Sequence, residues 1–97
     1  MKSEYKKKTF SQGEIIKIKN SNIENPGKII FVDKTALCKY KYLITKMNEK
    51  FGHWYSCDEI EIIKDEKIKE LVNKWYLRNE KTINACNTNR MIIKNFS

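Results

Sequence analysis

The chain has little of what catalytic and metal sites are usually built from. Histidine occurs once, at His53. The three glycines stand too far apart for a phosphate-binding loop, at Gly13, Gly27 and Gly52. The three cysteines, Cys38, Cys57 and Cys86, are widely spaced and include no CxxC pair, which disfavours a disulfide framework and a four-ligand zinc site. We therefore expect no enzyme activity, no metal and no cofactor.

One alternative uses these scarce residues together. Cys38, His53 and Cys57 would form a thiol–imidazole pair or a partial metal site if the fold brought them close. The simpler interpretation is that His53 ends a strand and that the cysteines pack as small apolar groups.

Long apolar runs are also missing. No stretch of eighteen apolar residues is present, which argues against a membrane-spanning helix, and the basic N-terminus lacks the apolar core of a secretory signal. With 40% hydrophobic residues, the 97-residue chain still has enough apolar surface for one globular domain. We expect a cytoplasmic protein.

Arginine is scarce in a strongly basic chain. The net charge is +8, yet only two of the twenty basic residues are arginines. Together with abundant isoleucine and asparagine, this composition suggests an AT-rich coding sequence, as in low-GC bacteria and their phages. Residues 1–57 carry a net charge of +7 and residues 58–97 carry +1. We therefore expect residues 1–57 to contact a polyanionic partner.

Four runs rich in β-branched and aromatic residues predict antiparallel strands at 14–19, 28–32, 39–45 and 53–55, with a short fifth at 61–63. The period of two places Ile16 and Ile18 inward on the first strand and sends Ile15, Lys17 and Lys19 outward. On the third strand, Tyr40, Tyr42 and Ile44 share one face, opposite Lys39, Lys41 and Leu43. The uniformly apolar second strand leaves its register open. Gly52 is expected to supply a positive φ in the loop at 48–52.

Three segments carry a resemblance to a known family. The segment at 13–18, GEIIKI, and the segment at 27–32, GKIIFV, resemble the opening hairpin of SH3-like small barrels of the KOW and Tudor kind. The segment at 54–60, WYSCDEI, is similar to the end of such barrels, with an aromatic strand, a one-turn helix and a last short strand. The resemblance implies a closed barrel over residues 10–63 that binds nucleic acid or protein without catalysis.

After the barrel, Asp65 is expected to cap a helix from Glu66 to about Arg78, with Glu70 and Lys74 as an ion pair. Residues 80–90 are polar and asparagine-rich, which favours a loop or a frayed continuation. Residues 91–96 would form a final strand in one alternative. The predicted fold is thus α+β and mainly β: a flexible basic arm (1–9), an SH3-like barrel (10–63), and a helix with a C-terminal segment (64–97). The expected core contains Ile16, Ile18, Tyr42, Ile44, Ile60, Ile68, Leu71 and Val72.

The first functional hypothesis is binding of RNA, DNA or a nucleoprotein complex. Lysines of the arm and of the first and third strands would contact phosphates, and two aromatics would stack on bases. Because lysine suits backbone contact better than base reading, such binding would tolerate sequence and weaken steeply with salt. The candidate residues are Lys6, Lys7, Lys8, Lys17, Lys19, Lys39, Lys41, Trp54 and Tyr55.

The rival hypothesis is a small phage-type inhibitor of a host defence nuclease, anti-CRISPR-like, that acts by protein contacts. The small size, the low-GC composition and the missing catalytic residues motivate this alternative. Its candidate residues are Lys67, Lys74, Trp75, Arg78, Lys81 and Ile92. Both hypotheses compete with a solvated basic surface that has no partner, and the oligomeric state stays open.

Overall fold

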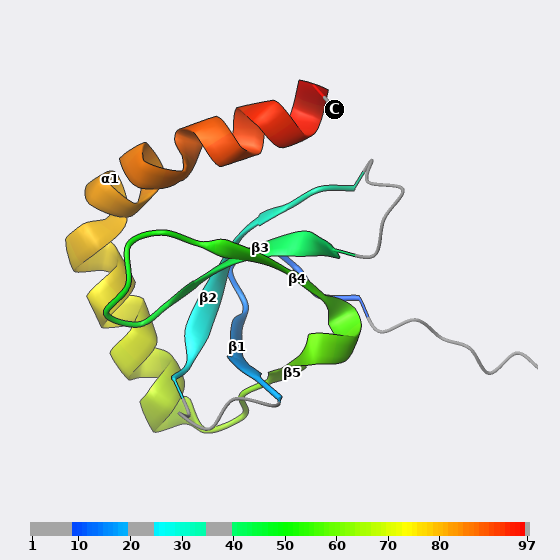
Figure 1. Ribbon diagram of the computed structural model, residues 1–97. Coiled ribbons are helices and arrows are strands. Elements are labelled where there is room, and N and C mark those ends of the chain that lie inside the picture. Colours follow the sequence, from blue (N-terminus) through cyan, green and yellow to red (C-terminus); the bar gives the residue numbers. More distant parts are fainter. Residues whose placement is uncertain (1–8, 20–24, 35–39, 97) are drawn as a thin grey trace, which may run out of the picture.

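A five-stranded antiparallel sheet and one long helix make up the computed structural model, which describes residues 9–19, 25–34 and 40–96. The elements in chain order are β1 (Ile15–Ile18), β2 (Gly27–Val32), β3 (Tyr40–Lys46), β4 (His53–Ser56), the 3-10 helix η1 (Cys57–Glu59), β5 (Ile60–Ile62) and α1 (Glu66–Phe96). The predicted α+β, mainly-sheet class is confirmed, as are the one-turn helix and the short strand that follow the aromatic strand. Figure 1 shows α1 wrapped around one side of the sheet.

The sheet is open. Its strand order is β4-β3-β2-β1-β5, so β4 and β5 are the two edges, and no ladder between the described residues joins them. The predicted closure into a barrel is therefore not confirmed. The chain reaches the far edge through η1, where Ser56 N donates a 2.8 Å hydrogen bond to Glu59 Oε1. The edge strands have only four and three residues, which leaves little backbone for a further ladder.

The inner face of the sheet carries the first core. Phe10 packs edge-on against Tyr42, with ring centroids 5.6 Å apart. Ile18 is only half-buried at the margin of this cluster, although the sequence predicted it inside. The predicted inward positions of Tyr42, Ile44 and Ile60 are confirmed, whereas the side chain of Tyr40 lies outside the described residues. The buried members are Phe10, Ile16, Ile29, Tyr42, Ile44 and Ile60.

The outer face is buried as well, beneath α1. Ile15 and Leu43 point away from the inner core, as the period of two predicts, yet they are 5% and 0% exposed because the helix covers them. One cluster joins Ile15 to Val72 of α1, and a second joins Leu43 to Ile83. Adjacent apolar residues on these strands therefore fill two cores, one on each face.

A β-bulge sets the register that the second strand left open. Ile29 pairs with Ile44, and the next pairing along the ladder is Phe31 with Leu43. The extra residue, Ile30, and Phe31 both pack in the outer cluster against α1.

Helix α1 begins where the sequence predicted and ends much later. Asp65 Oδ1 accepts hydrogen bonds from Lys67 N at 2.9 Å and from Ile68 N at 3.4 Å, which confirms the N-cap. The helix then runs for 31 residues to Phe96. The predicted end near Arg78, the loop at 80–90 and the alternative strand at 91–96 are therefore wrong. The chain contains no glycine or proline after Gly52, so nothing in that region forces the helix to stop.

The side of α1 that meets the sheet is narrower than expected. Leu71, predicted in the core, is 55% exposed, whereas the adjacent Val72 is fully buried. Successive residues are separated by about 100° around a helix, so both cannot face the sheet squarely. The buried side continues instead from Val72 to Ile83 and Asn87.

Asn87 is a fully buried polar residue that joins α1 to the β3–β4 hairpin. Its Oδ1 accepts a 2.7 Å hydrogen bond from Gly52 N, and its Nδ2 donates to Lys50 O at 2.9 Å and to Ile83 O at 2.7 Å. The amide thus satisfies two backbone groups of a loop 35 or more residues away in the chain. A buried amide whose hydrogen bonds are all formed stabilises one specific position of the helix on the sheet.

Gly52 is required for close packing and does not provide the positive φ predicted for it. A Cβ there would lie 3.1 Å from Ile44 O and 3.1 Å from Leu43 Cδ1. The residue with a positive φ in this hairpin is Asn48, at 73°. Asparagine tolerates that conformation better than most residues, so the turn forms without glycine.

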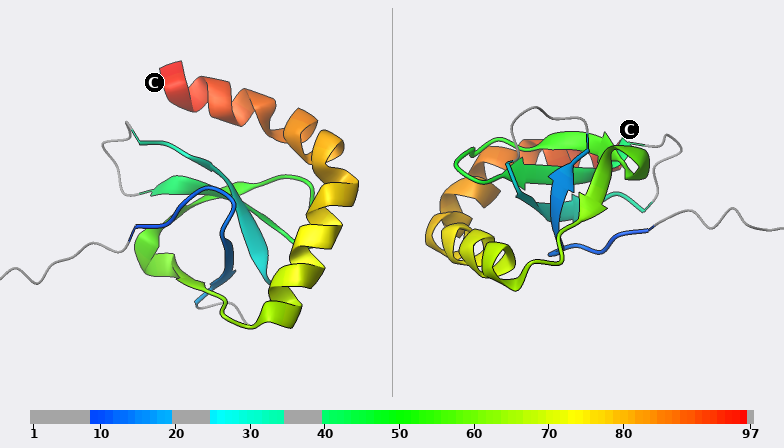
Figure 2. Two further views of the ribbon diagram at one scale, coloured as in Figure 1. Left: turned by 180° about the vertical axis from the view of Figure 1, so that it is seen from behind. Right: turned by 90° about the horizontal axis from the view of Figure 1, so that it is seen from below.

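Helix α1 changes direction partway along its length. Figures 1 and 2 show its first half along one side of the sheet and its second half crossing above β2 and β3, with the turn in the part coloured yellow to orange. Asn79 Nδ2 donates to Trp75 O at 2.8 Å, and Thr88 Oγ1 donates to Asn84 O at 2.6 Å. Side chains that bond carbonyls four residues earlier loosen the backbone ladder and bend helices.

The first half of α1 is tied to β2 through Lys28. Its Nζ donates a 2.6 Å hydrogen bond to Asn73 Oδ1 and lies 4.9 Å from the centroid of the Tyr76 ring. Burial lowers the pKa of Lys28, and nearby Glu80 partly opposes that shift. Glu80 therefore acts on the sheet side of the helix.

In the described part of the chain, α1 and η1 both lack an apolar stretch that could cross a bilayer.

Replacing Asn87 with Ala tests the amide contact. We expect the free energy of unfolding in urea to fall by about 2 kcal/mol, because Gly52 N and Lys50 O lose their buried partner. Asn89→Ala is the matched control: Asn89 is exposed on the same helix and gains the same helix propensity. The control should change stability by less than about 0.5 kcal/mol. Equal effects of the two substitutions would contradict a structural role for Asn87.

Candidate nucleic-acid interface

The lysines predicted on the first and third strands do not form one basic face. That prediction treated the two strands as neighbours, but β2 lies between β1 and β3. Lys17 follows Ile16, which pairs with Gly27 at the start of β2, while Lys41 O accepts a hydrogen bond from Asp33 N at its other end. At about 3.3 Å per residue, Lys17 and Lys41 are on the order of 20 Å apart along the sheet.

The local surroundings of these lysines differ too. Lys17 lies directly opposite Glu61 of β5 in the ladder, so a carboxylate offsets its charge. Lys19 is exposed and Lys41 is half-buried. The other predicted phosphate contacts, Lys6, Lys7, Lys8 and Lys39, lie outside the described residues.

The two aromatics predicted to stack on bases point to opposite faces. Trp54 lies opposite Leu43 and packs in the outer core, edge-on to Phe31 with ring centroids 6.2 Å apart. Tyr55 lies opposite Tyr42 and packs against the inner core. Burial raises the pKa of Tyr55 above its usual value. These residues are half-buried parts of two cores and do not form a shared stacking platform.

Four basic residues lie on the side of α1 that faces away from the sheet. All four were candidate residues of the rival hypothesis. Their spacing of seven, four and three residues keeps them within about 60° of arc and spreads them over about 21 Å of the helix. All four are exposed. We call this set the basic stripe, which consists of Lys67, Lys74, Arg78 and Lys81.

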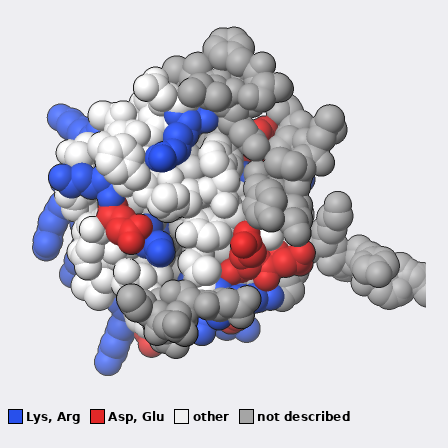
Figure 3. Space-filling view, viewed as in Figure 1, with Lys and Arg blue, Asp and Glu red and all other residues white. Residues whose placement is uncertain are grey.

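Few carboxylates oppose the basic stripe. Lys74 pairs with Glu70 at 3.7 Å, and both groups are more than half exposed, so this pair contributes little. Lys67, Arg78 and Lys81 make no ion pair with any carboxylate of the described residues. Figure 3 shows basic side chains along the margin occupied by α1 with one acidic patch among them, and a second acidic group over η1. The stripe therefore keeps a positive potential.

Trp75 and Ile92, the remaining candidates from the rival set, do not belong to this surface. Trp75 is half-buried and packs into both outer clusters beneath the helix. Ile92 lies near the end of α1, and its side chain is outside the described residues. Two leucines take their place among the exposed residues of the helix: Leu71 is 55% exposed and Leu77 is 69% exposed.

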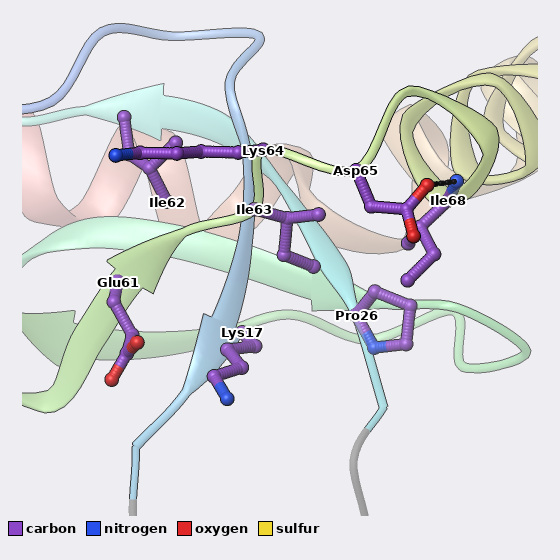
Figure 4. Close-up of a pocket in the computed structure, with 8 residues that line it drawn as sticks. All are labelled: Lys17, Pro26, Glu61, Ile62, Ile63, Lys64, Asp65 and Ile68. Atoms are coloured by element: carbon purple, nitrogen blue, oxygen red, sulfur yellow. Dashed lines mark hydrogen bonds between the residues drawn. The ribbon is translucent and has the colours of Figure 1, made fainter.

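A cavity of about 440 Å³ lies where β1, β5 and the start of α1 meet. In Figure 4 the side-chain end of Lys64 lies in the upper part of the view beside Ile62, separated from the ends of Lys17 and Glu61 in the lower part, and Asp65 is engaged with the backbone of α1. Its charged groups therefore do not converge on one point, as a small-molecule site requires. The lining residues are Lys17, Pro26, Glu61, Ile62, Ile63, Lys64, Asp65 and Ile68.

The scarce histidine and cysteines gain no further support as a metal site. His53 is exposed on β4 and Cys57 is half-buried in η1, while Cys38 lies outside the described residues. Within the described ranges, no three His, Cys, Asp or Glu side chains stand close enough to hold a metal ion.

Comparison of the chain with protein-family models, with curated proteins and with solved structures finds no match. The candidate site is therefore defined by the charge and exposure of this chain's own residues.

Two neighbouring substitutions test which side of α1 is exposed. We expect Leu71→Ala to change the free energy of unfolding by less than about 0.5 kcal/mol, because its side chain is already largely in water. Val72→Ala should cost about 2 kcal/mol, because it leaves a cavity between helix and sheet. Urea denaturation of both variants measures the difference. A larger loss for Leu71→Ala would show that the basic stripe faces inward.

Proposed function

We propose that this is a non-catalytic protein that binds nucleic acid through the basic stripe on α1. The observation that carries the proposal is the alignment of four exposed cations on one helix face, three of them without a carboxylate partner in the described residues. A regular row of positive charge matches the regular row of phosphates on a polynucleotide. Each phosphate that is neutralised releases condensed counterions, which favours binding.

The residue types of the stripe favour contact with the backbone over reading of bases. Three of the four cations are lysines, which act as mobile point charges, and only Arg78 could make planar paired contacts. Trp75 and Tyr76, the two aromatics of α1 whose side chains are described, pack toward the sheet. Binding through this face is therefore sequence-tolerant and strongly dependent on salt.

We also propose that the sheet is an SH3-like module that serves as the scaffold for α1. The placement of β5 beside β1 and the one-turn helix between β4 and β5 support this assignment. The role of the scaffold is mechanical. The sheet buries one side of α1 and leaves the basic stripe in solvent.

Neutralising the stripe tests the proposal. In the variant Lys67→Gln, Arg78→Gln and Lys81→Gln, we expect the affinity for a fluorescent DNA duplex at low salt to fall by about tenfold or more. The slope of log affinity on log salt should fall by between about two and three, since each phosphate contact contributes about 0.9. Glutamine is a good helix former, so α1 stays intact. Fluorescence anisotropy over a salt series provides both quantities.

The matched control is Lys17→Gln, Lys19→Gln and Lys41→Gln, which removes the same net charge from the sheet. This variant should retain affinity within about threefold, because its lysines lie apart from the stripe. If the control lost as much affinity as the stripe variant, the result would indicate that the binding site includes the lysines of the sheet. Absence of any binding by the unmodified protein at low salt would remove the proposed function.

One observation favours a second candidate, an inhibitor of a nuclease or nucleoprotein complex that acts by protein contact. Leu71 and Leu77 are 55% and 69% exposed, and they flank the stripe on either side. Exposed apolar groups beside cations suit an acidic protein surface with shallow apolar pockets.

The variant Leu71→Ser and Leu77→Ser separates the two candidates. Because the charge is unchanged, we expect its affinity for nucleic acid to remain within about twofold of the unmodified protein. Anisotropy with the same duplex measures it. A loss as large as that of the stripe variant would show that apolar contact, rather than charge, dominates this surface.

A further inference from the structure

The shape and composition of the basic stripe distinguish between single-stranded and double-stranded ligands. Proteins that bind single strands without sequence preference combine a positively charged groove with aromatic side chains on which bases stack. The stripe instead consists of exposed side chains on a single helix. That helix stands at the margin of the molecule (Figures 1 and 2). A convex surface cannot enclose a flexible strand.

In the part of the chain that the structure describes, stacking groups are also missing from this face. Trp54, Trp75 and Tyr76 pack in the outer core between sheet and helix. Phe51 is 54% exposed, but it belongs to the β3–β4 hairpin and not to the stripe. The centroid of its ring lies 5.5 Å from the guanidinium of Arg90. Within the described residues, the exposed neighbours of the four cations on α1 are aliphatic or polar. A single strand would therefore gain charge neutralisation alone.

Charge neutralisation alone favours the ligand with the higher density of phosphates. A duplex carries about one charge per 1.7 Å of its axis, and one strand contributes only half of that density. The stripe spans about 21 Å, the length of roughly six base pairs. A stiff duplex presents its phosphates along that length without ordering cost, whereas a single strand must first be straightened.

Resting on the proposed function, we infer that the preferred ligand of the basic stripe is double-stranded nucleic acid, contacted along its sugar–phosphate backbone. The four cations contact phosphates of the duplex, and Leu71 lies beside them at the edge of the stripe. No base is unstacked in this arrangement, so base composition has little effect on affinity.

The test compares one DNA strand of about 20 nucleotides, roughly three times the length of the stripe, alone and annealed to its complement. We expect the duplex to bind at least about tenfold more tightly at low salt, with a steeper salt dependence, because each duplex contact contributes about 0.9 to the slope and each single-strand contact about 0.7. The variant Lys67→Gln, Arg78→Gln and Lys81→Gln should abolish the preference, since its remaining charge is distributed over other faces.

The outcomes separate the two proposals. Single-strand binding that is equal or tighter, and that still falls in the stripe variant, overturns the duplex inference and leaves the proposed function standing. A duplex preference that the stripe variant retains overturns the assignment of that preference to α1. If neither probe binds at low salt, both proposals fall, and an acidic protein becomes the ligand that fits the stripe.

Discussion

The hydrogen bonds of the buried Asn87 amide hold the second half of α1 against the sheet. Without a partner on the β3–β4 hairpin, an asparagine at a fully buried helix position would cost free energy and would be selected against. With Gly52 N and Lys50 O as partners, the same residue fixes the rotation of the helix about its axis. That rotation determines which side chains face water. The exposure of the basic stripe thus depends on contacts made by the opposite side of the same helix, through Val72 and Asn73 in its first half and Asn87 in its second.

The architecture follows from strands that are apolar on both faces. Ile15 and Ile16 are adjacent and both buried, as are Leu43 and Ile44, so each face of the sheet needs a cover. Curvature of the sheet and Phe10 cover the inner face, and α1 covers the outer one. A single helix can bury only one side of itself on a sheet this small. Its remaining side must be polar, and in this chain it is largely cationic.

The sequence predicted those features that depend on local signals. The strand positions, the one-turn helix before the last strand and the Asp65 N-cap are all encoded within a few residues. The length of α1 was missed because Asn79, Asn84, Asn87 and Asn89 have weak helix propensity, and the buried Asn87 interrupts the apolar pattern. Its compensation comes from a loop 35 residues earlier, which no local signal reveals. The only available hint was the absence of glycine and proline after Gly52.

The location of the charge was missed for a different physical reason. A net charge of +1 over residues 58–97 suggested a neutral half, but five of its seven acidic residues precede Lys67, at Asp58, Glu59, Glu61, Asp65 and Glu66. Three of these carboxylates already have partners within the fold. Glu59 accepts a hydrogen bond from Ser56 N, Glu61 lies opposite Lys17, and Asp65 caps α1. Beyond Glu66 the helix holds seven cations against two acidic residues, and Glu80 acts on Lys28 at the sheet side. Separation of positive and negative charge along and around one helix creates a local electrostatic field. The net charge of the whole segment does not reveal that field. On the proposed function, a field of this kind would favour the approach of a polyanion to α1.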